Sequence, residues 1–189
     1  TKNGKKKRLI VDLSYPNPSI LKKASLTIFA GGTVLHPTDT VYGLGCDPFS
    51  EDSIQRILEL KKRTTEKGFL LLIPDPEWVP RLSSELPHDY SWLVNRLWPG
   101  PITFLLPASK SLPKTITGSQ SKIGLRCPAL PLLRLWLSQM KRPIVSTSAN
   151  PSGLSTPHST KRLDALFGDS VDLFIDAGEL PKSLPSTVI

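Results

Sequence analysis

Cysteine is scarce in this sequence of 189 residues, and long apolar runs are missing from it. The two cysteines, Cys46 and Cys127, are too few for a disulfide framework or for a zinc site built from cysteines. The longest apolar runs, such as residues 69–73, are far too short to span a bilayer. No N-terminal stretch has the pattern of a secretion signal. We therefore expect a soluble, cytoplasmic protein that works in a reducing compartment.

Histidine is also rare, and none of the three histidines has a partner at metal-ligand spacing. The sequence contains no Gly-x-x-x-x-Gly-Lys-Ser/Thr phosphate loop, no Gly-x-Ser-x-Gly nucleophile turn and no His-Glu-x-x-His zinc motif. No cysteine or serine has an evident histidine neighbour that would activate it. A reaction that depends on placing positive charge around phosphates and an anionic nucleophile needs none of these motifs.

Positive charge is concentrated at the N-terminus. The net charge is +8, and the first eight residues supply five of these charges with no acidic residue, which leaves +3 for the remainder. A tail of this kind is usually solvated, although it can also strengthen contacts with RNA phosphates. We interpret residues 1–12 as a basic tail and lead-in, and residues 13–189 as one domain.

Helical and strand patterns alternate along residues 13–189. Capping residues and helical spacing predict helices over 18–30, 50–63, 90–97 and 130–140, and a further helix that starts near 159. Apolar runs predict strands at 33–35, 69–73, 102–106, 123–127, 143–146 and 171–175. Segment 38–45 is polar and rich in glycine, so it is predicted to be a turn. The alternation predicts a single mixed α/β domain.

Four segments place polar residues next to predicted strands or helix ends, where ligands gather in open α/β sheets. They are 37–43, 61–67, 124–128 and 146–150. Lys61 and Arg63 stand at a helix C-terminus, so capping of that helix and binding of an anion are equally open. Arg126 has no acid close in sequence and can hold a carboxylate or phosphate with two hydrogen bonds. An ion pair with a remote acid is the alternative for Arg126.

Hydroxyl side chains are concentrated in two of these segments. Residues 146–150 offer three hydroxyls and an amide, which can bond phosphate or ribose oxygens. The same side chains can instead close a turn through bonds to their own backbone. Thr38 and Thr40 admit the same two interpretations.

Taken in order, these segments resemble the YrdC-like family of threonylcarbamoyl-adenylate synthases. The matching stretches are HPTDTVYGLG at 36–45, LKKR at 60–63, WPGPITF at 98–104, GLRCP at 124–128, STSANPSG at 146–153 and PSTVI at 185–189. Thr64 stands where the family usually has a proline. The resemblance implies a twisted, mostly open mixed sheet with flanking helices and a concave, basic site.

The resemblance also implies an activity. The enzyme would be a nucleotidyltransferase that joins L-threonine, bicarbonate or CO₂, and ATP into threonylcarbamoyl-AMP, with release of pyrophosphate. Other proteins would then use this product to make N6-threonylcarbamoyladenosine at position 37 of tRNAs, and the chain itself could contact tRNA but no membrane. Two alternatives stay open: a non-catalytic module that binds tRNA or double-stranded RNA, and a relative that forms a carbamoyl-adenylate from another substrate.

Roles for individual residues follow from the same resemblance. The ATP phosphates are assigned to Lys61, Arg63 and Lys67, of which Lys61 and Arg63 are the candidate catalytic residues. The adenylate is assigned to Thr147, Ser148 and Asn150. Threonine is assigned to Thr38, Tyr42, Arg126 and Ser186. Mg²⁺ is expected to enter with ATP, held by phosphates and water with no direct protein ligand.

Overall fold

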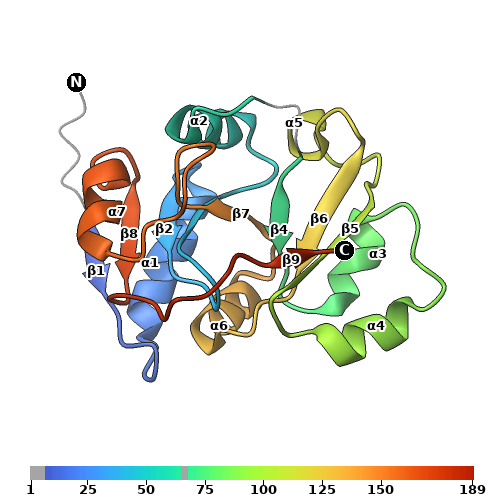
Figure 1. Cartoon of the computed structure of the whole chain (residues 1–189), viewed down its shortest axis with the longest axis horizontal. Coiled ribbons are helices and arrows are strands. Elements are labelled where there is room, and N and C mark those ends of the chain that lie inside the picture. Colours follow the sequence, from blue (N-terminus) through green and yellow to red (C-terminus); the bar gives the residue numbers. More distant parts are fainter. Residues whose placement is uncertain (1–6, 65–67) are drawn as a thin grey trace.

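A mixed β-sheet forms the centre of the protein (Figure 1). The computed structural model describes residues 7–64 and 68–189, and in this part nine strands lie in the order β1-β8-β2-β3-β7-β4-β6-β5-β9. The strands are β1 (Arg8–Ile10), β2 (Val34–His36), β3 (Gly43–Cys46), β4 (Leu70–Leu72), β5 (Ile102–Pro107), β6 (Lys122–Arg126), β7 (Ile144–Ser148), β8 (Leu173–Asp176) and β9 (Thr187–Val188). The helices are α1 (Pro18–Phe29), α2 (Glu51–Lys61), the 3-10 helix η1 (Pro76–Trp78), α3 (Val79–Leu82), α4 (Tyr90–Leu97), α5 (Lys114–Thr117), α6 (Pro131–Met140) and α7 (Thr160–Phe167).

Local sequence signals set the ends of the first two helices. Asn17 caps α1 through its side chain, and Pro18 occupies the first helical position, where its missing N–H is not needed. Ser50 caps α2 in the same way. α2 ends at Lys61 because Lys62 adopts a left-handed conformation with φ of 51°. The predicted starts of both helices are confirmed.

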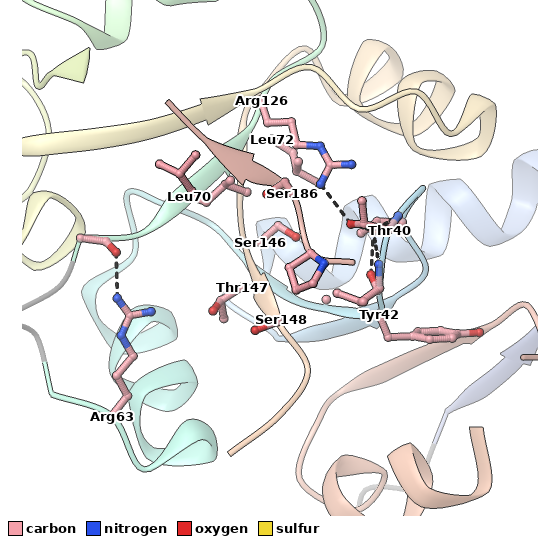
Figure 2. A pocket seen from close by; sticks show the side chains of 16 residues that line it. Thr40, Tyr42, Arg63, Leu70, Leu72, Arg126, Ser146, Thr147, Ser148 and Ser186 are labelled. Carbon is pink, nitrogen blue, oxygen red and sulfur yellow. Dashed lines mark hydrogen bonds between the residues drawn. The ribbon is translucent and has the colours of Figure 1, made fainter. Parts of the chain in front are cut away.

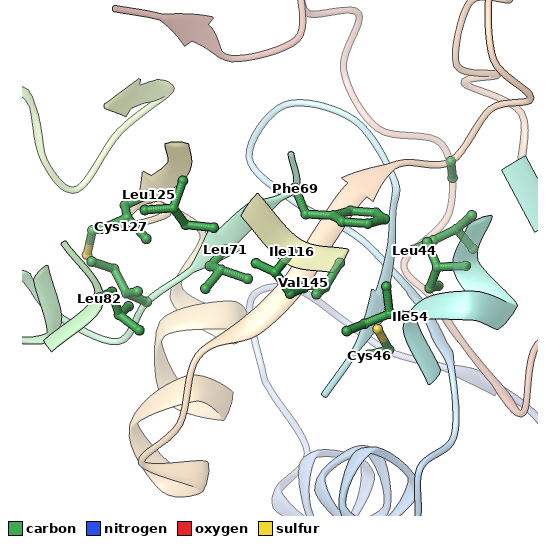
Figure 3. Packing of buried hydrophobic residues seen from close by; sticks show 14 of the residues in the cluster. Leu44, Cys46, Ile54, Phe69, Leu71, Leu82, Ile116, Leu125, Cys127 and Val145 are labelled. Atoms are coloured by element: carbon green, nitrogen blue, oxygen red, sulfur yellow. The ribbon is translucent and has the colours of Figure 1, made fainter. Parts of the chain in front are cut away.

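One face of the sheet packs against α2 and α5 (Figure 3). Leu71, Leu125 and Val145 lie on this face in neighbouring strands, because successive strand residues point to opposite sides. They pack with Ile54 of α2 and Ile116 of α5, and all five side chains are fully buried. Burial of such an aliphatic side chain contributes about 1.5–3 kcal/mol, so this layer is a main source of stability.

The opposite face is covered by α1 and α6 over only part of its width. Leu72 and Ile144 pack there against Trp136 of α6. Farther along the same face, Leu70 and Gly124 line pockets instead. These pockets therefore lie where α1 and α6 no longer cover this face of the sheet. The other half of the same face is packed into the hydrophobic core.

Three strands differ from what the sequence predicts. The turn predicted over 38–45 is wrong for its second half, since β3 starts at Gly43 and runs antiparallel to both β2 and β7. Glycine usually weakens a strand, but here Gly43 and Gly45 leave room for side chains of the adjacent strands. β1 lies within the segment taken as tail and lead-in, and it pairs parallel with β8. β9 has only two residues and no periodicity that would reveal it.

Candidate active site

A pocket with a volume of about 280 Å³ opens on the partly covered face of the sheet (Figure 2). Its walls come from loop 38–42, from β4, β6 and β7, from the segment after α2, and from residues 185–188. These segments are far apart in the sequence, but β7, β4 and β6 are neighbours in the sheet. The fold thus gathers in one place the segments that carry the polar motifs.

Arg126 stands at the end of β6 and is almost completely buried. Its Nε donates to the carbonyl of Gly100 at 2.9 Å, and its Nη1 donates to Thr40 Oγ1 at 3.1 Å. Nη2 lies 2.7 Å from Asp39 Oδ1 as an ion pair, yet neither atom has a well-aligned hydrogen bond within the described residues. The remote acid that the sequence left open is therefore Asp39, and Arg126 is at the same time a residue of the pocket lining.

The loop that carries Asp39 is held by the side chain of Thr38. Thr38 Oγ1 accepts hydrogen bonds from the N–H groups of Thr40 and Val41, at 3.0 and 3.1 Å, and donates to the Val41 carbonyl at 2.6 Å. Hydroxyl-to-backbone bonds of this kind fix tight turns. The turn interpretation of Thr38 is therefore confirmed; Thr38 and Thr40 both line the pocket, and their contact with a ligand stays a prediction.

Lys61 lies behind the pocket wall. Its side chain is 3% exposed, and Nζ donates to the carbonyl oxygens of Ser148 and Asn150. Burial lowers the pKa of this ammonium to about 8, and the nearby charge of Arg63 lowers it as well. Lys61 thus ties the end of α2 to the segment after β7, and its described contacts are with protein oxygens.

Arg63 follows α2 and reaches the pocket itself. Its Nη2 donates to the carbonyl of Gly68 at 2.8 Å, and its guanidinium carbon lies 4.9 Å from the centre of the Phe69 ring. Burial lowers the pKa of Arg63, but an arginine remains protonated at neutral pH. Lys67, the third basic residue assigned to the phosphates, lies outside the described residues.

β7 brings hydroxyl groups to the pocket. Ser146 and Ser148 share one face of the sheet, and Thr147 between them also lines the pocket. Asn150 lies beyond the lining, where its Oδ1 accepts a hydrogen bond from Lys61 at 3.3 Å and its Nδ2 donates to carbonyls that follow it in the chain. Asn150 therefore stabilises the turn after β7.

Ser186 enters the pocket from the far edge of the sheet. β9 pairs parallel with β5, with Thr187 opposite Ile102. Ser186 Oγ accepts a hydrogen bond from Thr103 Oγ1 at 2.9 Å. This pairing brings the last segment of the chain onto the site.

A family model described as Sua5_yciO_yrdC, "Telomere recombination", matches residues 27–189. The chain belongs to the Sua5/YciO/YrdC family. The resemblance of its motifs is thereby confirmed. Its single-domain α/β fold, with an open mixed sheet and flanking helices, also matches solved structures of Sua5 and YciO.

Relatives of similar length carry the name of an enzyme. The threonylcarbamoyl-AMP synthase of Coxiella burnetii is 37% identical over 158 residues, which is 84% of this chain and 85% of the relative. The protein of the same name from Marinobacter nauticus is 35% identical over 181 residues, 95% of each chain.

Two solved structures place the fold within the Sua5/YciO/YrdC family. P. abyssi Sua5 complexed with L-threonine has a TM-score of 0.88 and 32% identity, and the match covers 97% of this chain but 53% of that one. E. coli YciO has a TM-score of 0.86 and 26% identity, with coverage of 97% and 88%. The chain therefore spans about half the length of P. abyssi Sua5.

Most residues that the family resemblance assigned to ligands lie around one pocket. Those that line it are Thr38, Tyr42, Arg63, Arg126, Thr147, Ser148 and Ser186. Lys61 and Asn150 instead support its wall from behind. The family resemblance gave no individual role to Asp39 or Ser146, although Ser146 is one of the three hydroxyls that the sequence offered at 146–150.

The described residues of this Sua5/YciO/YrdC chain meet neither the requirements of a clustered metal site nor those of a membrane-spanning helix. Among them, no group of three or more His, Cys, Asp or Glu side chains is placed to hold a metal ion. No helix in the same residues has the length and apolar character needed to cross a membrane. Entry of Mg²⁺ together with ATP stays a prediction.

Tyr42 lines the pocket, but its hydroxyl is engaged elsewhere. The hydroxyl donates to the Gly178 carbonyl at 2.8 Å and accepts from the Ala177 N–H at 2.9 Å. Figure 2 shows the ring directed away from Ser146 and Ser148. Burial raises the pKa of Tyr42 to about 12, so the hydroxyl stays protonated.

We expect Tyr42→Phe to lower the free energy of unfolding by about 1–3 kcal/mol, because Ala177 and Gly178 lose their hydrogen-bond partner. Thermal unfolding measures this loss. KM for L-threonine should stay within about twofold of the original value, since Phe keeps the ring and backbone. Tyr90→Phe is the control, because it removes a single hydroxyl bond to the Pro76 carbonyl. A raised KM with an unchanged melting temperature would show that the hydroxyl contacts threonine.

Proposed function

We propose that this chain forms threonylcarbamoyl-AMP and pyrophosphate from L-threonine, bicarbonate or CO₂, and ATP. The observation that carries the proposal is the buried guanidinium of Arg126, which borders a pocket of hydroxyl groups that Arg63 also reaches. The names of the bacterial relatives and the L-threonine complex of P. abyssi Sua5 support it. Other proteins would transfer the threonylcarbamoyl group to tRNA.

Threonine would occupy the end of the pocket next to Arg126. Arg126 lines the pocket, and its guanidinium can donate to the threonine carboxylate. The hydroxyls of Thr38 and Ser186 line the same pocket from different loops. Short polar side chains around an arginine suit a small amino acid, because they leave room and offer hydrogen bonds.

ATP would occupy the end next to α2 and β7. Arg63 supplies a cation for the triphosphate, with Lys67 as a further candidate, and Thr147 and Ser148 offer hydroxyls to the adenylate. Lys61 and Asn150 would act mainly by holding the backbone that carries Ser148. Mg²⁺ would arrive bound to the phosphates of ATP.

The chemistry of this reaction suits a pocket of fixed cations. The amine of threonine adds to CO₂ and loses a proton, which gives a carbamate anion. A carbamate oxygen attacks the α-phosphorus of ATP, the bond to the bridging oxygen breaks, and pyrophosphate leaves. Two anions must approach each other, so preorganised positive charge and correct positioning lower the barrier. The nucleophile is already anionic, and the attack needs no strong general base.

The test is an assay that supplies each substrate separately. Purified protein with MgATP should release pyrophosphate and give a threonine-containing AMP adduct, seen by mass spectrometry, only when L-threonine and bicarbonate are both present. Omission of either should abolish both products. Pyrophosphate release at the same rate without threonine would overturn the proposal, and so would tight binding of tRNA with no adduct under any condition.

A further inference from the structure

A histidine lies behind the pocket on the same sheet face as Ser146. His36 is fully buried at the end of β2, where it stands opposite Gly43 of β3. Ser146 of β7 stands opposite Gly45, the next residue of β3 on that face. The imidazole therefore reaches across the glycine strand toward Ser146, and its Nε2 lies 3.4 Å from Ser146 Oγ.

The two glycines make this contact possible. A Cβ atom on Gly43 would lie 2.7 Å from Ser146 Oγ and 3.1 Å from Cε1 of His36. A Cβ atom on Gly45 would lie 3.1 Å from Nε2 of His36. A larger residue at Gly43 would displace both the hydroxyl and the ring, and one at Gly45 would displace the ring. The β3 glycines that misled the sequence-based prediction of a turn thus have a structural purpose.

The contact of the second ring nitrogen, Nδ1, indicates where the proton lies on His36. Nδ1 of His36 lies 3.1 Å from the carbonyl oxygen of Pro37, and a carbonyl can only accept a hydrogen bond. Nδ1 must then carry the proton, which leaves Nε2 of the neutral ring as an acceptor. Burial lowers the pKa of His36 to about 4, so the ring is neutral at physiological pH. Trp136 packs on the ring in an edge-to-face arrangement, with 5.7 Å between ring centres.

We propose that His36 is a positioning residue: it accepts the hydroxyl proton of Ser146, so that the Ser146 oxygen faces the pocket as an acceptor for an N–H donor of the substrate. This inference rests on the proposed function, in which that donor is the amino group of threonine. Ser146 lines the same pocket as Arg126, so an amino acid would meet a donor for its carboxylate and an acceptor for its amine. A hydroxyl free to rotate would give no such preference.

The first test reads the protonation of the ring and needs no substrate. In ¹⁵N-labelled protein at pH 7, the nitrogen shifts of His36 should show a neutral ring with the proton on Nδ1. The signals of His36 are identified by their loss in His36→Gln, since His88 and His158 are the only other histidines of the sequence. A proton on Nε2 would overturn the inference, because His36 would then donate to Ser146.

The second test measures whether His36 acts through Ser146. By calorimetry, His36→Phe should weaken L-threonine binding about tenfold when Ser146 is present, and by less than about twofold in a Ser146→Ala background. Binding of 3-hydroxybutyrate, which lacks the amino group, should change little in either variant. Equal losses in both backgrounds, or equal losses for both ligands, would overturn the inference and indicate a purely structural role.

A third variant separates the possible failures. His36→Gln places an amide oxygen near the position of Nε2 and should restore most of the threonine affinity, and it replaces the Phe variant in the comparison if that one does not fold. Original protein that binds no threonine would overturn the proposed function. The ring-proton measurement would still decide the His36–Ser146 hydrogen bond in that case.

Discussion

Arg126→Lys should lower kcat/KM for L-threonine by about 100-fold, the largest catalytic loss expected from a single substitution here. Lysine keeps the charge but has one ammonium on a flexible stem, so it cannot reproduce the fixed donors of a guanidinium. A loss of about 3 kcal/mol in hydrogen bonding to a carboxylate corresponds to this ratio. Initial rates measure this loss, first with threonine varied at saturating ATP and then with ATP varied at saturating threonine.

The matched control is Arg134→Lys, which makes the same change at an exposed position of α6. It should leave both kinetic constants unchanged. An equal rise of KM for ATP and threonine in Arg126→Lys would contradict a carboxylate contact. Alanine at 126 is a poorer test, because it leaves Asp39 without its cation, and breaking a buried ion pair costs about 3–5 kcal/mol.

Lys61→Ala should lower the free energy of unfolding by about 2–4 kcal/mol and raise KM for ATP about tenfold. The carbonyls of Ser148 and Asn150 lose their shared donor, and the buried stem of the lysine leaves a cavity. Ser148 then loses the support that fixes it at the pocket. Denaturant unfolding and ATP kinetics at saturating threonine measure the two effects.

Lys62→Ala is the control, since it removes the same charge from the adjacent, exposed residue. Its stability should stay within about 0.5 kcal/mol of the original protein, with unchanged kinetics. A Lys61 variant that is destabilised but binds ATP normally would end the assignment of Lys61 to the nucleotide site and leave it a structural role.

Elements with their own local signals could be predicted from the sequence. Asn17 and Ser50 mark helix starts because a side-chain oxygen there satisfies a free N–H group. Apolar runs such as Leu70–Leu72 indicate a strand buried on both faces. β3 could not be predicted, because glycine at positions 43 and 45 is required by the close approach of β2 and β7. These strands come near β3 only in the folded sheet.

The site could be predicted as a set of segments but not as a set of contacts. The motifs at 36–45, 124–128 and 146–153 carry the pocket residues in order. Spacing along the chain cannot show that Arg126 pairs with Asp39, or that Lys61 bonds the backbone after β7, because these partners meet only through sheet order. The same limit hid the contact between His36 and Ser146.

The pairing of Arg126 with Asp39 also bears on selectivity against common salts. A guanidinium that already faces a carboxylate generates a weaker attractive field than a bare one. Inorganic phosphate, sulfate and chloride should therefore compete poorly for the position next to Arg126. They carry charge but have no amino group or side chain to add contacts. An amino acid should therefore stay bound at high concentrations of these ions.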